Sequence, residues 1–250
     1  MNVLVTGGAG YLGPFVARFL AREHRVLLTD VKQPAQKPEQ EFRVVDMTSL
    51  DQVMRASEGM DAIVNCSVVR ESERLAFAVN SGGCWNMMTA AVRHGIKRIL
   101  NTGPHFTVTG PPYEGFDFGM DGDIPPQSST ILYALTKSLG HEVCRVFSEH
   151  HDIHVLNFLF YNFRDLRGAA EGSFNRLRPG SNPVPFVVSG DDAAKAIRLG
   201  LTVDKAKLPS RSEVFLILTD MPHGKFRNDK AKRILGWRPK DDISALWRKV

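Results

Sequence analysis

Residues 2–13 read NVLVTGGAGYLG, an apolar, β-branched run that passes directly into a turn with glycine at positions 7, 10 and 13. Such a run is typical of a buried strand. From Phe15 to Leu20 the apolar residues recur at helical spacing. The first twenty residues therefore predict a strand, a glycine turn and a helix.

The glycine turn has the features that a dinucleotide site requires. Gly7 permits a tight exit from the strand, Gly10 permits close approach of the backbone to a pyrophosphate, and Gly13 permits close packing of the helix on the strand. The N–H groups at the start of the helix, where Tyr11 and Leu12 lie, would face the phosphates. Because glycine turns also close strands that bind nothing, this pattern is weak by itself.

A carboxylate at the end of the second predicted strand strengthens the case. This strand covers residues 25–29 and ends at Asp30. A carboxylate at that position accepts hydrogen bonds from both hydroxyls of an adenosine ribose and repels a 2′-phosphate. We therefore expect the cofactor to be NAD rather than NADP, although Lys32 weakens the exclusion of NADP.

Strands and helices alternate along the chain. Further strands are predicted over residues 42–45, 61–66, 97–102, 154–158 and 214–218, and helices near 49, over 73–94 and 128–150, from 187, and over 228–235. This alternation predicts an α/β fold with a Rossmann-type doubly wound parallel sheet. We expect an NAD-binding domain over residues 1–160 that returns for 186–203, and a small substrate-binding part made of 161–185 and 204–250.

Further cofactor contacts are expected where the strands end. The Asp46 carboxylate or the Met47 backbone can bind the exocyclic amine of adenine; alternatively, Asp46 is the N-cap of the helix that starts near Ser49. Cys66 ends the fourth predicted strand, Ser67 follows it, and both are assigned to the same site. Ser128 or Ser129 would cap the helix predicted over 128–150.

Composition limits the function classes. The chain has 250 residues, of which 43% are hydrophobic and 24% charged, as in a soluble globular protein. No apolar run is long enough to span a membrane, and Met1 leads straight into the first strand, so we expect no membrane span, no signal peptide and a cytoplasmic location. The net charge of +5 is scattered, which favours a solvated basic surface over nucleic-acid binding. The cysteines and histidines lack metal-ligand spacing, so no metal site is expected.

Tyr133 and Lys137 are the predicted catalytic pair. Four residues apart in a predicted helix, they lie on one face. Because a free tyrosine is a poor base at neutral pH, it needs an adjacent cation that favours the phenolate. Tyr133 would then exchange a proton with a substrate oxygen while a hydride moves to or from a nicotinamide. Lys137 would also hold the nicotinamide ribose.

Together these motifs resemble an extended short-chain dehydrogenase/reductase, the NAD-dependent epimerase/dehydratase family. The resemblance rests on the glycine turn, Asp30, the Tyr-Lys pair, residues 80–86 and the tail KRILGWRP at 232–239. It implies a Rossmann domain, bound NAD, a cofactor role for Asn80, tyrosine acid/base chemistry on sugars, and homodimers packed through two long helices. The short C-terminal part is more similar to uronate dehydrogenases than to nucleotide-sugar epimerases.

One position departs from the family pattern. The family usually carries Ser or Thr after the fifth strand, and here Gly103-Pro104-His105 offers no hydroxyl. Thr102, His105 and Thr107 are the candidates to replace it. His105 can donate a hydrogen bond to the substrate oxygen; alternatively, it is a loop residue without a catalytic role.

The expected function is NAD-dependent oxidation or reduction of a sugar or sugar-acid hydroxyl. The loop over 103–128 would form a lid or one wall of the cleft, and arginines suited to an anionic substrate occur in the next irregular stretch, at Arg164, Arg167, Arg176 and Arg178. One alternative is a nucleotide-sugar epimerase or dehydratase that retains its NAD. Another is a non-catalytic NAD-binding sensor, which the missing hydroxyl permits.

Overall fold

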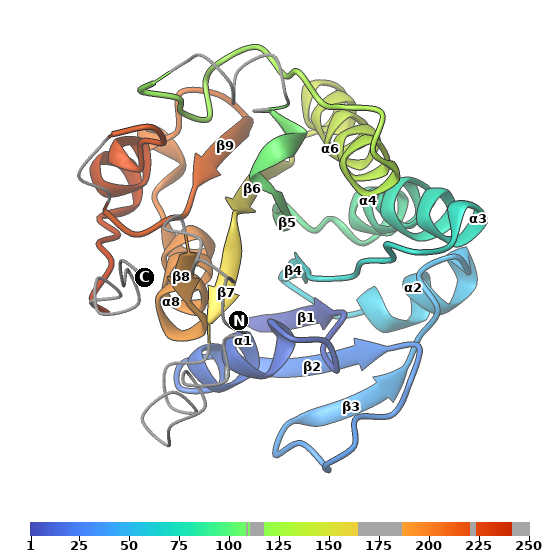
Figure 1. Cartoon of the computed structure of the whole chain (residues 1–250). Helices are drawn as coiled ribbons and strands as arrows, with labels where there is room; N and C mark the ends of the chain where they lie inside the picture. The colour runs from blue at the N-terminus through green and yellow to red at the C-terminus, as the bar shows by residue number, and fades with distance from the viewer. Residues whose placement is uncertain (109, 111–117, 165–186, 221–223, 242–250) are drawn as a thin grey trace, which may run out of the picture.

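A parallel sheet of seven strands, in the order β3-β2-β1-β4-β5-β6-β9, forms the centre of the molecule (Figure 1). The structure is a computed structural model, and it describes all residues except 109, 111–117, 165–186, 221–223 and 242–250. The strands of the sheet are β1 (Asn2–Thr6), β2 (Arg25–Asp30), β3 (Glu41–Val44), β4 (Ala62–Asn65), β5 (Arg98–Pro104), β6 (His154–Phe160) and β9 (Ser212–Leu216). The Rossmann-type fold is thus confirmed.

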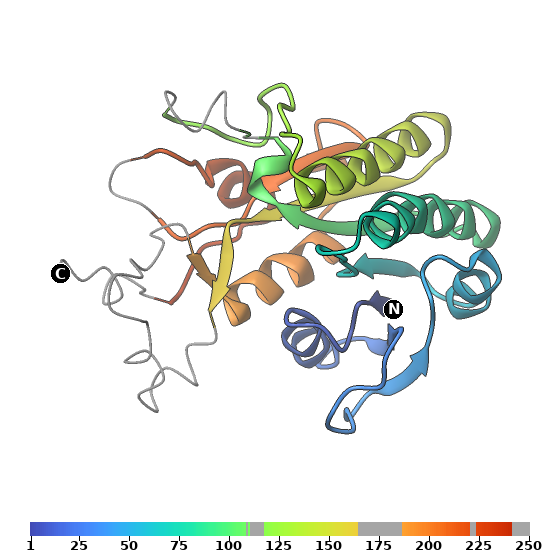
Figure 2. The ribbon, with the colours of Figure 1, turned by 45° about the vertical axis from the view of Figure 1, so that its right-hand side comes forward.

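Helices cover both faces of this sheet. They are α1 (Gly13–Leu20), α2 (Leu50–Ser57), α3 (Glu73–Ala76), α4 (Gly83–His94), α6 (Leu132–His150) and α8 (Gly190–Thr202), with short turns η1 (Phe77–Gly82), η2 (His105–Thr107), η4 (Lys205–Lys207) and η5 (Ala231–Leu235). Helices α2, α4 and α6 pack in a row on one face, and α1 and α8 pack together on the other (Figure 2).

Successive residues of the strands supply two separate cores. On β1, Val3 and Val5 join the core beneath α1 and α8, whereas Leu4 joins the core beneath α2, α4 and α6. This follows from the alternation of side chains along a strand. The strands can be apolar throughout because helices bury both faces. Strand order reverses between β1 and β4, and the carboxyl ends of strands at such a point frame a ligand crevice.

Two predicted helix starts need correction. The helix expected from Ser128 or Ser129 begins at Leu132, with Ile131 as its N-cap, while Ser129 Oγ accepts a hydrogen bond from Ile131 N at 3.2 Å. The helix expected from residue 187 begins at Gly190, because Val187–Ser189 form strand β8, which pairs with β7 (Asn162–Arg164). Ser189 caps that helix by accepting a hydrogen bond from Asp192 N.

The helix expected over 73–94 is interrupted by a wider turn. Between α3 and α4, residues 77–82 form the π-helical turn η1, and α4 ends at Gly95, whose φ is 70°. Asn80 lies within this wide turn and is buried, at 1% exposed. π turns of this kind often occur at functional sites.

Residues 212–216, expected within the small substrate-binding part, form the edge strand β9 of the main sheet, beside β6. Much of the remaining proposed substrate-binding part lies outside the described residues, so the domain division stays a prediction. In the described ranges, no helix is both long and apolar enough to cross a bilayer.

Candidate active site

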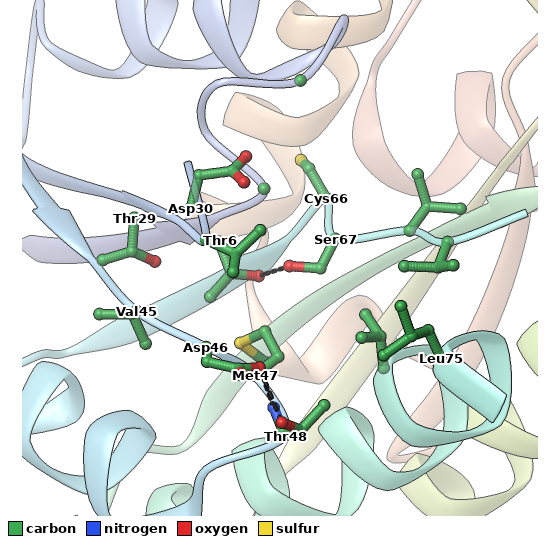
Figure 3. A pocket seen from close by; sticks show the side chains of 16 residues that line it. Thr6, Thr29, Asp30, Val45, Asp46, Met47, Thr48, Cys66, Ser67 and Leu75 are labelled. Carbon is green, nitrogen blue, oxygen red and sulfur yellow. Dashed lines mark hydrogen bonds between the residues drawn. The ribbon is translucent and has the colours of Figure 1, made fainter. Parts of the chain in front are cut away.

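Two adjoining cavities follow the carboxyl ends of the strands. The first, of about 210 Å³, lies at the ends of β1, β2 and β4 and over the residues after β3 (Figure 3). The second, of about 410 Å³, lies at the end of β5 and the start of α6. Gly10, Cys66 and Val68 line both. The cavities therefore form one elongated crevice, with the glycine turn at its middle.

The glycine turn has the shape of a phosphate cradle. Gly7 has a φ of 69°, and a Cβ there would lie 2.5 Å from the carbonyl carbon of Cys66. A Cβ at Gly13 would lie 2.3 Å from Gly8 O, so α1 packs directly on the turn. Leu12, the N-cap of α1, makes no side-chain capping bond. The N–H groups at this helix start are therefore open to an anion.

Asp30 lies at the first cavity, as expected. Its Oδ2 accepts a hydrogen bond from Ala9 N at 3.1 Å, which ties the end of β2 to the glycine turn. The other oxygen is 3.5 Å from Lys32 N. A bare backbone cradle beside this carboxylate fits the pyrophosphate and the ribose of NAD.

Asp46 and Met47 also line the first cavity. The Asp46 carboxylate accepts hydrogen bonds from Thr48 N and Thr48 Oγ1, both at 2.8 Å, and Met47 O accepts one from Asn86 Nδ2. The alternative role of Asp46 as a helix cap is wrong, because Ser49 is the N-cap of α2. Asp46 instead shapes the turn that precedes this helix.

A row of buried polar side chains crosses the sheet from Ser67 and Thr6, which line the first cavity. Ser67 Oγ donates to Thr6 Oγ1 at 2.9 Å (Figure 3). Thr6 Oγ1 in turn donates to Asn65 Oδ1 at 2.7 Å. Asn65 Nδ2 donates to Asn101 Oδ1, and Asn101 Nδ2 donates to Asn157 Oδ1. These residues are paired across β1, β4, β5 and β6. The row therefore links the ends of four neighbouring strands.

Tyr133 and Lys137 line the second cavity together, on one side of α6. Lys137 is 2% exposed, and its Nζ donates a hydrogen bond to Ser67 O at 3.1 Å. The Tyr133 ring packs edge-on against Phe106, with centroids 5.6 Å apart. The spacing in the sequence thus delivers both groups to one cavity, beside Gly10 and Tyr11 of the cradle.

Burial opposes ionisation of both groups. It raises the pKa of Tyr133 above its ordinary value, while the charge of Arg70 and its hydrogen bond to the phenol act in the opposite direction. Burial lowers the pKa of Lys137, and the neighbouring Arg70 charge lowers it further. The pKa of the Cys66 thiol rises to about 12 through burial. A buried thiol of this kind is an unreactive lining group.

Of the three candidates to replace the missing hydroxyl, only Thr102 lines the described part of the crevice. Thr102 Oγ1 donates a hydrogen bond to Asn65 O at 2.8 Å. His105 is 2% exposed and stacks on Tyr161, with ring centroids 4.1 Å apart. Thr107 Oγ1 donates to Pro104 O. Thr102 therefore lines the cavity, whereas His105 and Thr107 pack outside its described lining.

Asn80 lies behind the crevice rather than on its wall. Its Oδ1 accepts a hydrogen bond from Val69 N at 3.0 Å, and its Nδ2 donates to Val69 O at 2.7 Å and to Thr136 Oγ1 at 2.9 Å. Asn80 therefore holds the segment after β4 against α6. In this arrangement it positions the residues that line the cavity.

Arg70 is a lining residue that the sequence did not reveal. Its guanidinium carbon lies 4.9 Å from the centroid of the Tyr133 ring, and the side chain lines the second cavity. The sequence signal that could have indicated this residue is a basic side chain five positions after the end of β4. Arg167, Arg176 and Arg178 lie outside the described residues, as does part of the loop 103–128, so their expected roles stay predictions.

A parallel sheet with a phosphate-sized glycine cradle at the reversal of its strand order is the fold of a dinucleotide-binding protein. The family model "NAD dependent epimerase/dehydratase family" matches residues 3–164, more than half of the chain. The chain belongs to this family, so the resemblance to extended short-chain dehydrogenases/reductases is confirmed. NAD is confirmed as the cofactor of the family, and the cradle with Asp30 fits it.

Curated relatives include dehydrogenases. The uronate dehydrogenase of Pseudomonas syringae pv. tomato is 29% identical over 165 residues, which cover 62% of this chain and 57% of the relative. The NAD-dependent glucose-6-phosphate dehydrogenase of Haloferax volcanii is 29% identical over 175 residues, which cover 62% of this chain and 66% of the relative. The matches thus span less than two thirds of either relative.

Solved structures share the fold. Uronate dehydrogenase from Agrobacterium tumefaciens superposes with a TM-score of 0.77 at 21% identity, covering 98% of this chain and 86% of that one. UDP-glucose 4-epimerase from Thermotoga maritima has a TM-score of 0.79 at 17% identity, with 97% and 95% covered.

Proposed function

We propose that this protein is an NAD-dependent oxidoreductase acting on a hydroxyl of a sugar or sugar acid. The observation that carries the proposal is that Tyr133 and Lys137 line the same crevice as the glycine cradle. Cofactor and acid/base groups are thereby adjacent, which hydride transfer coupled to proton transfer requires. The uronate and glucose-6-phosphate dehydrogenases among the relatives support the substrate class.

Each group has a distinct role in this proposal. Bound NAD supplies the hydride acceptor. Tyr133 takes the proton of the substrate hydroxyl, and Lys137, held by Ser67 O, favours the phenolate and binds the nicotinamide ribose. Asp30 binds the adenosine ribose, and Gly10 leaves room for the pyrophosphate. Oxidation then removes one hydride and one proton and leaves a carbonyl.

We propose Thr102, rather than His105, as the replacement for the Ser or Thr hydroxyl that the family usually carries after the fifth strand. Thr102 lines the cavity together with Tyr133 and Lys137, and its Oγ1 donates to Asn65 O. His105 instead packs among the rings of Tyr161, Phe106 and Phe226. We assign His105 to holding the wall behind the cavity.

Release of NADH distinguishes a dehydrogenase from an epimerase or dehydratase that retains its cofactor. The purified protein is mixed with NAD and a panel of uronates, and absorbance at about 340 nm, where reduced nicotinamide absorbs, is followed. A dehydrogenase accumulates NADH in proportion to the uronate consumed. Conversion of a nucleotide sugar without accumulated NADH would favour the epimerase alternative instead. A sensor would bind NAD and convert nothing.

We further propose a homodimer formed through α4 and α6. Trp85 on α4 is 55% exposed, and Leu139 and Val146 on α6 are 41% and 38% exposed. Exposed large apolar side chains on two adjacent helices suit a self-complementary contact with a second copy.

A further inference from the structure

Arg70 presents its guanidinium to the second cavity. It lies over the Tyr133 ring at 4.9 Å and is otherwise exposed. Among the residues that the structure describes, no Asp or Glu forms a salt bridge with it. The charge is therefore available to a ligand that reaches Tyr133.

The backbone that carries Arg70 is held firmly. Ser67 N donates to Asn65 Oδ1, and Ser67 O accepts from Lys137 Nζ. Two residues further on, both backbone groups of Val69 are bonded to the Asn80 side chain. Arg70 thus extends from a segment fixed to β4, η1 and α6. A binding group on a fixed segment loses less entropy when it captures a ligand.

The second cavity gathers positive charge without acidic compensation. Arg70 and Lys137 both line it, and none of its described lining residues is Asp or Glu. The two cations repel each other: burial is the main cause of the lowered pKa of Lys137, and the charge of Arg70 lowers that pKa further. An anionic group on the substrate would relieve this repulsion. A guanidinium also binds a carboxylate or phosphate with two parallel hydrogen bonds.

We propose that Arg70 is the specificity-determining residue of the substrate site and binds an anionic group, a carboxylate or a phosphate, on the sugar whose hydroxyl reaches Tyr133. This inference rests on the proposed function, because it assumes a sugar in the second cavity. It predicts that the protein discriminates against the neutral sugar of the same skeleton.

Three sugars that differ only at C6 provide the test: glucuronate, glucose 6-phosphate and glucose. Their affinities for the NADH-loaded protein are measured by calorimetry, so that no turnover is needed. Wild-type protein is expected to bind one of the two anions more tightly than glucose. Arg70→Gln should weaken that anion about 10- to 100-fold, the range of a charge-assisted hydrogen bond. Binding of glucose and of NADH should change less than about two-fold.

Two further variants sharpen the result. Arg70→Lys keeps the charge but loses the planar fork, and should fall between wild type and Arg70→Gln. Arg74→Gln is the matched control, because Arg74 is an exposed arginine four residues further along the chain, in α3 and outside the described cavity linings. It should match wild type in all three titrations.

Several results would overturn the inference. Equal affinity of wild-type protein for all three sugars would do so, as would unchanged anion binding in Arg70→Gln. An equal loss of NADH affinity would assign Arg70 to the cofactor instead. Anion binding that depends on Arg70, in a protein that turns over none of the three sugars, would support the anion site while counting against the proposed reaction.

Discussion

At the scale of single residues, Arg70 and Tyr133 make a prediction about pH. Burial raises the pKa of Tyr133, and Arg70 lowers it. Removing Arg70 removes a lowering influence, so the pKa of the phenol rises further. Because oxidation requires the phenolate, the acid limb of kcat/KM against pH should move to higher pH in Arg70→Gln. Rate profiles for glucose oxidation, which does not involve the anion, measure this shift. A limb that stays in place or moves to lower pH would show that Arg70 does not act on Tyr133.

His141, two helical turns after Tyr133, predicts a loss of stability in acid. Burial, followed by the charge of Lys137, lowers its pKa to about 3 from an ordinary value of 6.5. Between these values the unfolded chain binds a proton that the folded chain does not, so the free energy of unfolding decreases as pH falls through this window. His141→Gln lacks this titration. From pH 7 to pH 5 the wild type should therefore lose about 2 kcal/mol more than the variant in urea unfolding. Equal losses in the two proteins would refute this assignment.

At the scale of elements, breaking the polar row across the sheet should lower the free energy of unfolding. Asn101 is fully buried and bonded to Asn65 on one side and Asn157 on the other. Asn101→Ala leaves a buried donor and a buried acceptor unpaired, at about 1–3 kcal/mol for each. Urea unfolding should show a loss of a few kcal/mol, whereas the control Gln36→Ala, at an exposed loop amide, should lose less than about 1 kcal/mol. A loss at Asn101 no larger than that of the control would mean that the row contributes little.

The same elements show what the sequence can and cannot predict. All seven strands of the sheet were predictable, because most are apolar or β-branched runs flanked by turn residues. The start of α6 was not, because Ile131 begins the helix without any capping side chain. The need for glycine at position 103 was also not predictable. A Cβ there would lie 2.5 Å from His141 Cε1, and this contact joins residues that are far apart in the sequence.

At the scale of the whole molecule, the exposed apolar face of α4 and α6 predicts the oligomeric state. Trp85 packs edge-on against Phe147, with centroids 5.2 Å apart, and still exposes 55% of its surface. Buried aromatic residues at the centre of an interface often dominate its energy. Trp85→Glu should therefore convert the dimer to a monomer in sedimentation equilibrium. Phe118→Glu, at an exposed loop position, should not. A monomeric wild-type protein at micromolar concentration would contradict the dimer.

Across the whole chain, local patterns were sufficient for the first cavity and insufficient for the whole of the second. Gly7, Gly10 and Asp30 sit in short motifs whose geometry follows from neighbouring residues. Arg70 acquires its position only when Asn80 and α6 fix the segment after β4. Such a position depends on contacts distant in sequence, and periodicity does not reveal it.

The central claim is that one crevice binds NAD and carries the Tyr133 chemistry, and Tyr133→Phe tests it most directly. NAD affinity, measured by calorimetry, and uronate-dependent NADH formation are compared for wild type and variant. We expect the variant to bind NAD within about two-fold of wild type and to lose about 10²- to 10⁴-fold in turnover, the contribution of a positioned acid/base group. Absence of NAD binding in the wild type, or full turnover in Tyr133→Phe, would contradict it.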